Sequence, residues 1–332
     1  MSGLFEAYED IDDLAAGLDA QDAGERRVAV MELADLGQPS AIPHLARALG
    51  DTDVGVRRQA AIALGEFDGL EAAKALATGV VDTDHEVASA AANSMAELKD
   101  AAAAPALLPL LSHPSAFVRM SALRALKELR TADALAPALE ALQDDDAQVR
   151  VQAVGVIGFL KLEEATPALI AATQDSDVSV RRAAVNALAF SQARGSLEAI
   201  RRTLSDADWM VREIAAETIG KNANGLMAVP DLSGALDDEF WQVRLKAVRS
   251  LGQLKVQSAV IAIAKSLTDP QSNLRKEAAA ALGEIADPRG EPFLLAVADD
   301  PDPDVRKNVK WALGRLGGSA AVPAVNGREL PA

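Results

Sequence analysis

The stretch Asp51-Thr-Asp-Val-Gly-Val-Arg-Arg-Gln-Ala-Ala-Ile-Ala-Leu-Gly65 decides the fold, because similar stretches return along the whole chain. The arginine after its second valine recurs at a step of 31 residues, with one step of 32: Arg26, Arg57, Arg119, Arg150, Arg181, Arg212, Arg244, Arg275 and Arg306. Ala88 occupies the place of the one missing arginine, so the chain holds ten copies of one unit. Self-similarity at this period predicts a repeat array.

Each copy predicts two helices. We call the second one helix B and count its positions from the arginine as zero. Apolar residues at −1, +3, +7 and +10, such as Val56, Ala60, Leu64 and Phe67, form one face at helical spacing. The Asp-rich turn before helix B supplies N-cap residues. Helix A comes next and tends to begin near a proline, which the first turn of a helix tolerates.

The repeats predict an all-α fold: an α/α superhelical solenoid of about ten two-helix repeats, in which each pair packs only against its neighbours. We expect a single solenoid over residues 11–325, an N-terminal extension or cap at 1–10, and a mobile tail at 326–332. An eleventh helix A begins at residues 321–325 and is cut short.

Composition narrows the functional classes. There is no cysteine, which excludes disulfides, thiolate nucleophiles and cysteine-ligated metals. The net charge of −16 disfavours nucleic acid as a partner and is compatible with a basic protein partner. The longest apolar run, residues 101–111, is too short to span a bilayer, and the N-terminus lacks a basic signal-peptide region. We expect a cytoplasmic protein that binds no membrane.

The pattern Asp-x-x-Val-Arg-x-x-Ala-x-x-Ala-Leu-Gly, followed by Ala-x-Pro-Ala-Leu, resembles the HEAT repeats. Specifically, it is similar to the short HEAT-like repeats named after phycobilisome lyases, and the resemblance covers about residues 11–325. It implies that helix B lines the concave face. Members of the family include scaffolds, assembly factors, chromophore lyases and a few metal enzymes, so the resemblance is specific for fold rather than for function.

No catalytic or metal-binding constellation stands out. The metal-enzyme branch of the family holds two irons with several His-Glu pairs, whereas this chain has one, His85-Glu86, which we expect in an exposed turn. We therefore expect no metal, no cofactor and no catalytic residue. The turn aspartates and the recurring arginines are interpreted as structural, with the aspartates capping helices and pairing with the arginine of an adjacent repeat.

Departures from the repeat pattern are the better functional clue. Positions +1, +5 and +9 of helix B point away from the buried face. Position +9 is usually charged or polar, but Phe159 and Phe190 stand there in copies five and six. The predicted partner-binding patch joins them with these neighbours: Val151, Gly155, Asn186, Arg124, Glu128, Glu217 and Lys221. An apolar patch with a polar rim is typical of a binding site. The alternative is that both rings cover the next helix.

A second departure lies at position −3, in the turn before helix B. Copies seven and eight carry Trp209 and Trp241 there, with Phe240 beside the latter. Tryptophan is enriched at interface hot spots, so these residues join the predicted partner-binding set. The alternative is that they pack under the preceding helix A. Trp311, at +5 of the last copy, is either a concave contact or part of a C-terminal cap.

These features favour a non-enzymatic scaffold, adaptor or assembly chaperone that grips a partner protein on the concave face of the solenoid. The partner's identity and the oligomeric state stay open, with a monomer slightly favoured. The competing hypothesis is an enzyme: a protein similar to the phycobilin lyases, which attach a tetrapyrrole to a partner protein or remove it. Such an activity needs no cysteine in this chain, but no residue of the sequence points to a tetrapyrrole.

Overall fold

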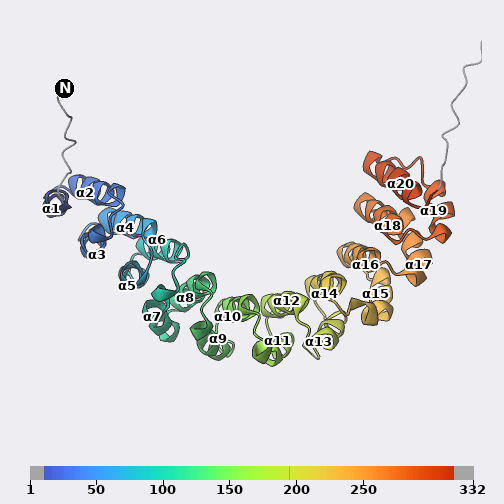
Figure 1. Cartoon of the computed structure of the whole chain (residues 1–332), viewed down its shortest axis with the longest axis horizontal. Coiled ribbons are helices and arrows are strands. Elements are labelled where there is room, and N and C mark those ends of the chain that lie inside the picture. Colours follow the sequence, from blue (N-terminus) through green and yellow to red (C-terminus); the bar gives the residue numbers. More distant parts are fainter. Residues whose placement is uncertain (1–10, 194, 318–332) are drawn as a thin grey trace, which may run out of the picture. The chain divides into compact units, whose positions relative to one another are not determined.

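The structure is a computed structural model that describes residues 11–193 and 195–317, apart from the side chain of Phe190. All regular secondary structure in these residues is helical (Figure 1), which confirms the predicted all-α class. The predicted extension at 1–10, the helix start at 321–325 and the tail at 326–332 lie outside the described residues. The chain divides into two compact units, Met1–Ala168 and Leu169–Ala332, which we call unit 1 and unit 2 and describe separately.

Unit 1 contains complete pairs of helices A and B. Its A helices are α1 (Ile11–Ala16), α3 (Ile42–Ala48), α5 (Leu70–Gly79), α7 (Ala104–Leu107) and α9 (Leu135–Ala141). Its B helices are α2 (Ala23–Asp35), α4 (Val54–Ala63), α6 (His85–Met95), α8 (Ala116–Leu129) and α10 (Ala147–Leu160). Each B helix contacts the next one along the unit.

Unit 2 repeats the same alternation. Its A helices are α13 (Ser196–Thr203), α15 (Val229–Gly234), α17 (Val260–Lys265) and α19 (Glu291–Ala296). Its B helices are α12 (Val178–Ala187), α14 (Trp209–Lys221), α16 (Trp241–Gln253), α18 (Ser272–Ile285) and α20 (Pro303–Arg315). One further A helix, α11 (Thr166–Ala172), runs across the division between the units. Here too, successive B helices contact one another.

Short 3-10 helices flank the α-helices in both units. They are η1 (Gly17–Asp19), η2 (Pro39–Ala41), η3 (Leu64–Glu66), η4 (Ala101–Ala103), η5 (Leu108–Ser112), η6 (Ala132–Ala134), η7 (Glu163–Ala165), η8 (Leu188–Phe190), η9 (Gly225–Ala228), η10 (Ala235–Asp237), η11 (Gln257–Ala259), η12 (Ser266–Thr268) and η13 (Pro288–Gly290). Many of them form the first or last turn of an A helix, where a 3-10 turn tightens the helix end.

The core follows the predicted face of helix B. In the second copy Val56, Ala60 and Leu64 are fully buried and Phe67 is nearly so. Alanine and leucine dominate the buried set, which allows the backbones of neighbouring helices to approach closely. Burying one leucine side chain stabilises the folded state by about 2 kcal/mol, and the repeat multiplies that gain along each unit.

A recurring arginine–aspartate clamp ties one repeat to the next. Arg57 donates from Nε and Nη2 to the two carboxylate oxygens of Asp82, at 2.7 and 3.2 Å. Its Nη1 donates to the carbonyl oxygens of Asp51 and Thr52, at 3.0 and 3.4 Å. The same clamp recurs as Arg26–Asp51, Arg119–Asp144, Arg181–Asp206, Arg212–Asp238, Arg244–Asp269 and Arg275–Asp300. The structural interpretation of the arginines is therefore confirmed.

The two aspartates of a turn divide the predicted roles between them. Asp51 accepts the clamp from Arg26, and this hydrogen bond is the main reason why the pKa of Asp51 lies below its ordinary value. Asp53 is the N-cap of α4 and accepts from the backbone N–H of Val56 at 3.0 Å. Position −6 of helix B thus binds the preceding repeat, and position −4 starts the helix.

One clamp of this series is missing in unit 1. Ala88 stands in place of the arginine, and His113 stands in place of the aspartate that would have bound it. Nδ1 of His113 accepts from the N–H of Ser115 at 3.1 Å, as the carboxylate of Asp51 accepts from the N–H of Asp53 at 2.8 Å. The histidine keeps the turn but offers no carboxylate, so the α6–α8 junction holds without the clamp.

Candidate functional site

The exposed face of the B helices is the candidate binding surface, and we call it the B-face. In unit 1 positions +1, +5 and +9 of the B helices are exposed or half-buried, as predicted. Several large apolar side chains of the chain stand exposed at +5 or +9: Met31, Ile62, Phe159 and Trp311. Their recurrence at these positions gives the B-face apolar contact area inside a charged surround.

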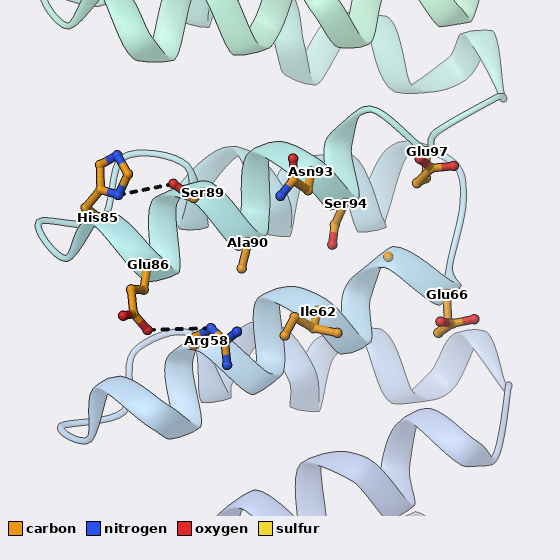
Figure 2. Close-up of a pocket in the computed structure, with 11 residues that line it drawn as sticks. Arg58, Ile62, Glu66, His85, Glu86, Ser89, Ala90, Asn93, Ser94 and Glu97 are labelled. Atoms are coloured by element: carbon orange, nitrogen blue, oxygen red, sulfur yellow. Dashed lines mark hydrogen bonds and ion pairs between the residues drawn. The ribbon is translucent and has the colours of Figure 1, made fainter.

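A groove on the B-face of unit 1 runs between α4 and α6 (Figure 2). Its volume is about 660 Å³, and its lining comes from one face of each helix. At one end Arg58 pairs with Glu86 at 3.7 Å, and the hydroxyl of Ser89 lies 3.4 Å from Nδ1 of His85. His85 and Glu86 are exposed, as predicted, but they begin α6 instead of lying in a turn, and they line the rim of this groove.

The other end of the groove is acidic. Glu66 and Glu97, at position +9 of successive repeats, lie there one above the other in Figure 2. Both are exposed, and no described residue forms an ion pair with either carboxylate. The next residue of this column, Glu128, has cations of its own, with Lys127 at 3.3 Å and Lys99 at 4.0 Å.

The floor of the groove is formed where Gly65 meets Ser94. A Cβ atom added at Gly65 would lie 2.7 Å from Oγ of Ser94, so the serine side chain would have to turn away before a larger residue could fit. The residue Ser94 is 8% exposed, and its hydroxyl forms no hydrogen bond with a described residue. Figure 2 shows that this hydroxyl points toward α4. A nearly buried serine thus turns an unbonded hydroxyl into the groove.

A second hollow of about 330 Å³ adjoins it between α6 and α8. Arg124 lies there with its Nη1 3.5 Å from Oδ1 of Asn93, and Phe117 and Met120 contribute apolar surface. The ring of Phe117 lies 5.8 Å from that of His85. The predicted site residue Arg124 therefore lies in unit 1 beside the groove and contacts Asn93.

Unit 2 closes the corresponding junction, α14–α16, with its own side chains. The hydroxyl of Ser250 donates to the carbonyl oxygen of Ala216 at 2.7 Å. Glu217 accepts from Lys221 at 2.6 Å and from Lys246 at 2.5 Å. Burial alone would raise the pKa of Glu217, but the hydrogen bonds from the two lysines outweigh it and lower the pKa to about 2.

The next junction of unit 2, α16–α18, also carries a paired B-face. Arg249 donates from Nε and Nη2 to the carboxylate of Glu277, at 2.9 and 2.7 Å. Burial is the main cause that raises the pKa of Glu284, with the charge of Glu277 adding to it. At these two junctions of unit 2, therefore, most of the charged side chains of the B-face, though not Glu284, pair with one another.

The predicted patch residues of unit 1 lie on α8 and α10. Phe159 is 38% exposed, and the guanidinium carbon of Arg130 lies 5.0 Å from the centre of its ring, within cation–π range. Val151 and Gly155 are half-buried on the same helix as Phe159, and Glu128 is held by the lysines named above. The ring is thus accessible on one side and covered by a cation on another.

The remaining patch residues belong to unit 2. Asn186 is exposed on α12, whereas Glu217 and Lys221 pair with each other on α14. The side chain of Phe190 lies outside the described part of the chain. The patch that joins Phe159 and Phe190 therefore stays a prediction.

The predicted tryptophans, expected in the turns before the B helices, are the first residues of α14 and α16 in unit 2 and are half-buried. Trp209 stacks on Phe240, with ring centres 5.4 Å apart and an interplanar angle of 11°. The guanidinium carbon of Arg212 lies over the ring of Phe240, 5.5 Å from its centre. Phe240 takes the N-cap position of α16, where most other copies have aspartate, so the stack stands in place of a capping hydrogen bond.

Trp311 is partly packed and partly exposed. Its ring covers Gly283 of α18 so closely that a Cβ there would collide with it. The side chain is nevertheless 46% exposed and lines a shallow hollow with Lys307, Lys310 and Arg315. It therefore packs the end of unit 2 while leaving part of the indole open.

The structure adds residues that the sequence reasoning missed. In residues 11–193 and 195–317 no three His, Asp or Glu side chains come together as a metal site would need. No helix in that part is long and apolar enough to cross a membrane. The sequence reasoning did not single out the groove residues Ile62, Ser94 and Glu97, although position +6 has alanine in half of the copies and Ser94 is one of two serines there. That serine was the available signal.

Comparisons with known proteins agree with this architecture. The family model described as HEAT repeats matches the chain in overlapping segments: residues 11–90, 79–149, 135–220, 197–280, 228–298 and 262–328. No curated protein sequence matches the chain. The match is to HEAT repeats in general, and the likeness to the phycobilisome-lyase type stays a prediction.

Solved structures give likenesses of fold. A crystal structure of an engineered protein is 21% identical with a TM-score of 0.49, covering 92% of this chain and 98% of that one. A chain from the complex of Kap95p with RanGDP is 16% identical with a TM-score of 0.64, covering 92% of this chain and 50% of that one. This chain thus spans about half the length of the latter. Its fold is an α/α solenoid, and with HEAT repeats matched from residue 11 to residue 328 the chain belongs to the HEAT-repeat family.

Proposed function

We propose that this chain is a non-enzymatic protein-interaction scaffold, an adaptor or assembly chaperone, that binds a partner protein through the B-face. The observation that carries the proposal is the recurrence of exposed apolar side chains at positions +5 and +9, among them Ile62 and Phe159. Exposed apolar surface rimmed by polar residues is typical of a protein-interaction site. The charged groups around them supply a polar rim.

The test is affinity purification of the tagged chain from its native host at low and moderate salt, with mass spectrometry of the retained proteins. We expect one stoichiometric partner that stays bound at moderate salt. The double variant Phe159→Glu/Phe190→Glu should lose it by at least about tenfold, because a charge in an apolar contact costs more than about 1.4 kcal/mol. The matched control, Asp133→Asn/Glu140→Gln, alters exposed residues at the A helices of unit 1 and should retain the partner.

Of two contrary outcomes, the first would contradict the proposal itself and the second would contradict only the predicted patch. One is that nothing is retained, or only basic proteins that moderate salt removes. The other is that both double variants, each folded by circular dichroism, retain the partner as well as the wild type does; this would remove the Phe159/Phe190 patch from the binding surface.

A further inference from the structure

The α4–α6 groove of unit 1 and the α14–α16 junction of unit 2 are built from the same repeat positions. Gly65 corresponds to Gly220 at +8, and Ser94 corresponds to Ser250 at +6. In both places the glycine lets the serine of the next B helix approach closely. Differences between the two junctions therefore come from the side chains that surround this shared contact.

In unit 2 those surrounding side chains include a basic group. Lys246, at +2 of α16, extends to Glu217 on α14, and only 19% of its side chain is exposed. In unit 1 the same position holds Ala90, which fills no such space. The groove of about 660 Å³ opens where this lysine is missing.

The groups left in the unit 1 groove are those that a cation would bind. Glu66 and Glu97 are exposed carboxylates without an ion pair among the described residues. Ser94, a residue that is only 8% exposed, adds a hydroxyl that bonds to no described residue. Ile62 and Ala90 add an apolar wall along which the methylene stem of a long basic side chain can lie.

We propose that the α4–α6 groove is a receptor for a basic side chain of a partner protein, with its head group between Glu66, Glu97 and Ser94. Arginine fits this set of acceptors best, because its planar guanidinium carries five donors and can serve two carboxylates and a hydroxyl together. The inference rests on the proposed scaffold function and locates one contact of the partner, separate from the Phe159/Phe190 patch.

The test uses fluorescence anisotropy with the full chain and a labelled glycine–serine peptide that carries arginines. Its twin carries citrulline, which has the same shape without the charge. We expect the citrulline peptide to bind at least about tenfold more weakly, and Glu66→Gln/Glu97→Gln to weaken the arginine peptide by a similar factor. Ser94→Ala should cost about two- to threefold, because a neutral hydrogen bond is weaker than a charge-assisted one.

The control variant Asp133→Asn/Glu140→Gln removes the same number of charges at the A helices of unit 1 and should bind the arginine peptide within about twofold of wild type. Circular dichroism verifies that every variant is folded. Equal binding of the two peptides, unchanged binding by Glu66→Gln/Glu97→Gln, or an equal loss in the control would overturn the proposal, since each would leave only bulk attraction to an acidic protein.

The two proposals fail separately. If the wild type recovers a partner but the peptide ignores the groove, the scaffold function stands and the receptor assignment is wrong. If no partner is recovered while the peptide depends on Glu66 and Glu97, the groove binds basic side chains and the scaffold function is wrong.

Discussion

The α4–α6 junction of unit 1 and the α14–α16 junction of unit 2 share a close glycine–serine contact, but the serine hydroxyl is free in the first and bonded in the second. In unit 2 the hydroxyl of Ser250 is bonded to Ala216, and Glu217 is held between two lysines. In unit 1 the hydroxyl of Ser94 faces a groove. A repeat array keeps its scaffold fixed at a few positions. The side chains at neighbouring positions can therefore pair with one another at one junction and stay available for a ligand at another.

The largest expected difference concerns the glycines. A Cβ at Gly220 would lie 2.9 Å from the Cα of Ser250 and would break its hydrogen bond, whereas at Gly65 the Cα of Ser94 is 3.5 Å away. We expect Gly220→Ala to lower the free energy of unfolding by about 1–3 kcal/mol. Gly65→Ala should change it by less than about 1 kcal/mol, because the free hydroxyl can turn away and alanine loses less backbone entropy on folding than glycine does.

Urea unfolding followed by circular dichroism measures both variants against the wild type. A change in midpoint without a change in slope identifies an effect on stability. Equal losses for the two alanine variants would mean that the two junctions are equally tight, and the contrast drawn between them would be wrong.

The second expected difference is electrostatic. We expect Glu217→Gln to cost about 1–2 kcal/mol at pH 7, because it leaves two lysines without their carboxylate. Glu66→Gln should cost less than about 0.5 kcal/mol, because Glu66 is exposed and has no ion pair among the described residues. Comparing Glu217→Gln with Glu66→Gln therefore distinguishes a carboxylate that stabilises the fold from one that is free for a ligand.

The pH dependence of this difference has a definite sign. The folded-state pKa of Glu217, about 2, lies below the ordinary value of 4.5. The stabilisation by Glu217 is therefore complete above the ordinary pKa and is lost as the pH falls from there toward 2. Urea midpoints of wild type and Glu217→Gln should differ at pH 7 and converge near pH 2. A difference that stays constant down to pH 2 would contradict the ion-pair explanation.

The sequence contains most of the scaffold but little of this contrast. The step of 31 residues predicts the helix pairs, and the Val56, Ala60 and Leu64 face predicts the core. The sequence also indicates the missing clamp, because Ala88 and His113 replace the arginine and the aspartate that would have paired with each other. Local helix chemistry and nearest-neighbour packing decide these features, and both are periodic in the chain.

The groove was hidden because it depends on which side chains of two successive repeats fill one space. Position +2 looks unremarkable as Ala90 until Lys246 shows what can lie there. Conversely, Glu217 was predicted as a partner contact, and the structure gives it two lysines inside unit 2. Charge and exposure at one position say little without the partner that the next repeat supplies.

The smallest expected effect comes from transplanting the closed junction into the open one. The triple variant Ile62→Glu/Glu66→Lys/Ala90→Lys places the Glu217, Lys221 and Lys246 set around Gly65 and Ser94. We expect the three changes to couple favourably by at most about 1 kcal/mol, because partly exposed ion pairs contribute little. Arginine-peptide binding should fall by at least about tenfold, because the introduced lysine fills the groove and the acidic end is lost.

The matched control is Ile62→Gln/Glu66→Gln/Ala90→Gln, which alters the same positions without creating an ion pair. Its stability should equal the sum of its single variants, whereas the charged triple variant should exceed that sum. If both triple variants are simply additive, the unit 2 arrangement depends on more than these three side chains. In unit 2 Lys246 fills the space that Ala90 leaves open in unit 1. A charged variant that still binds the arginine peptide would show that the basic group does not enter this space.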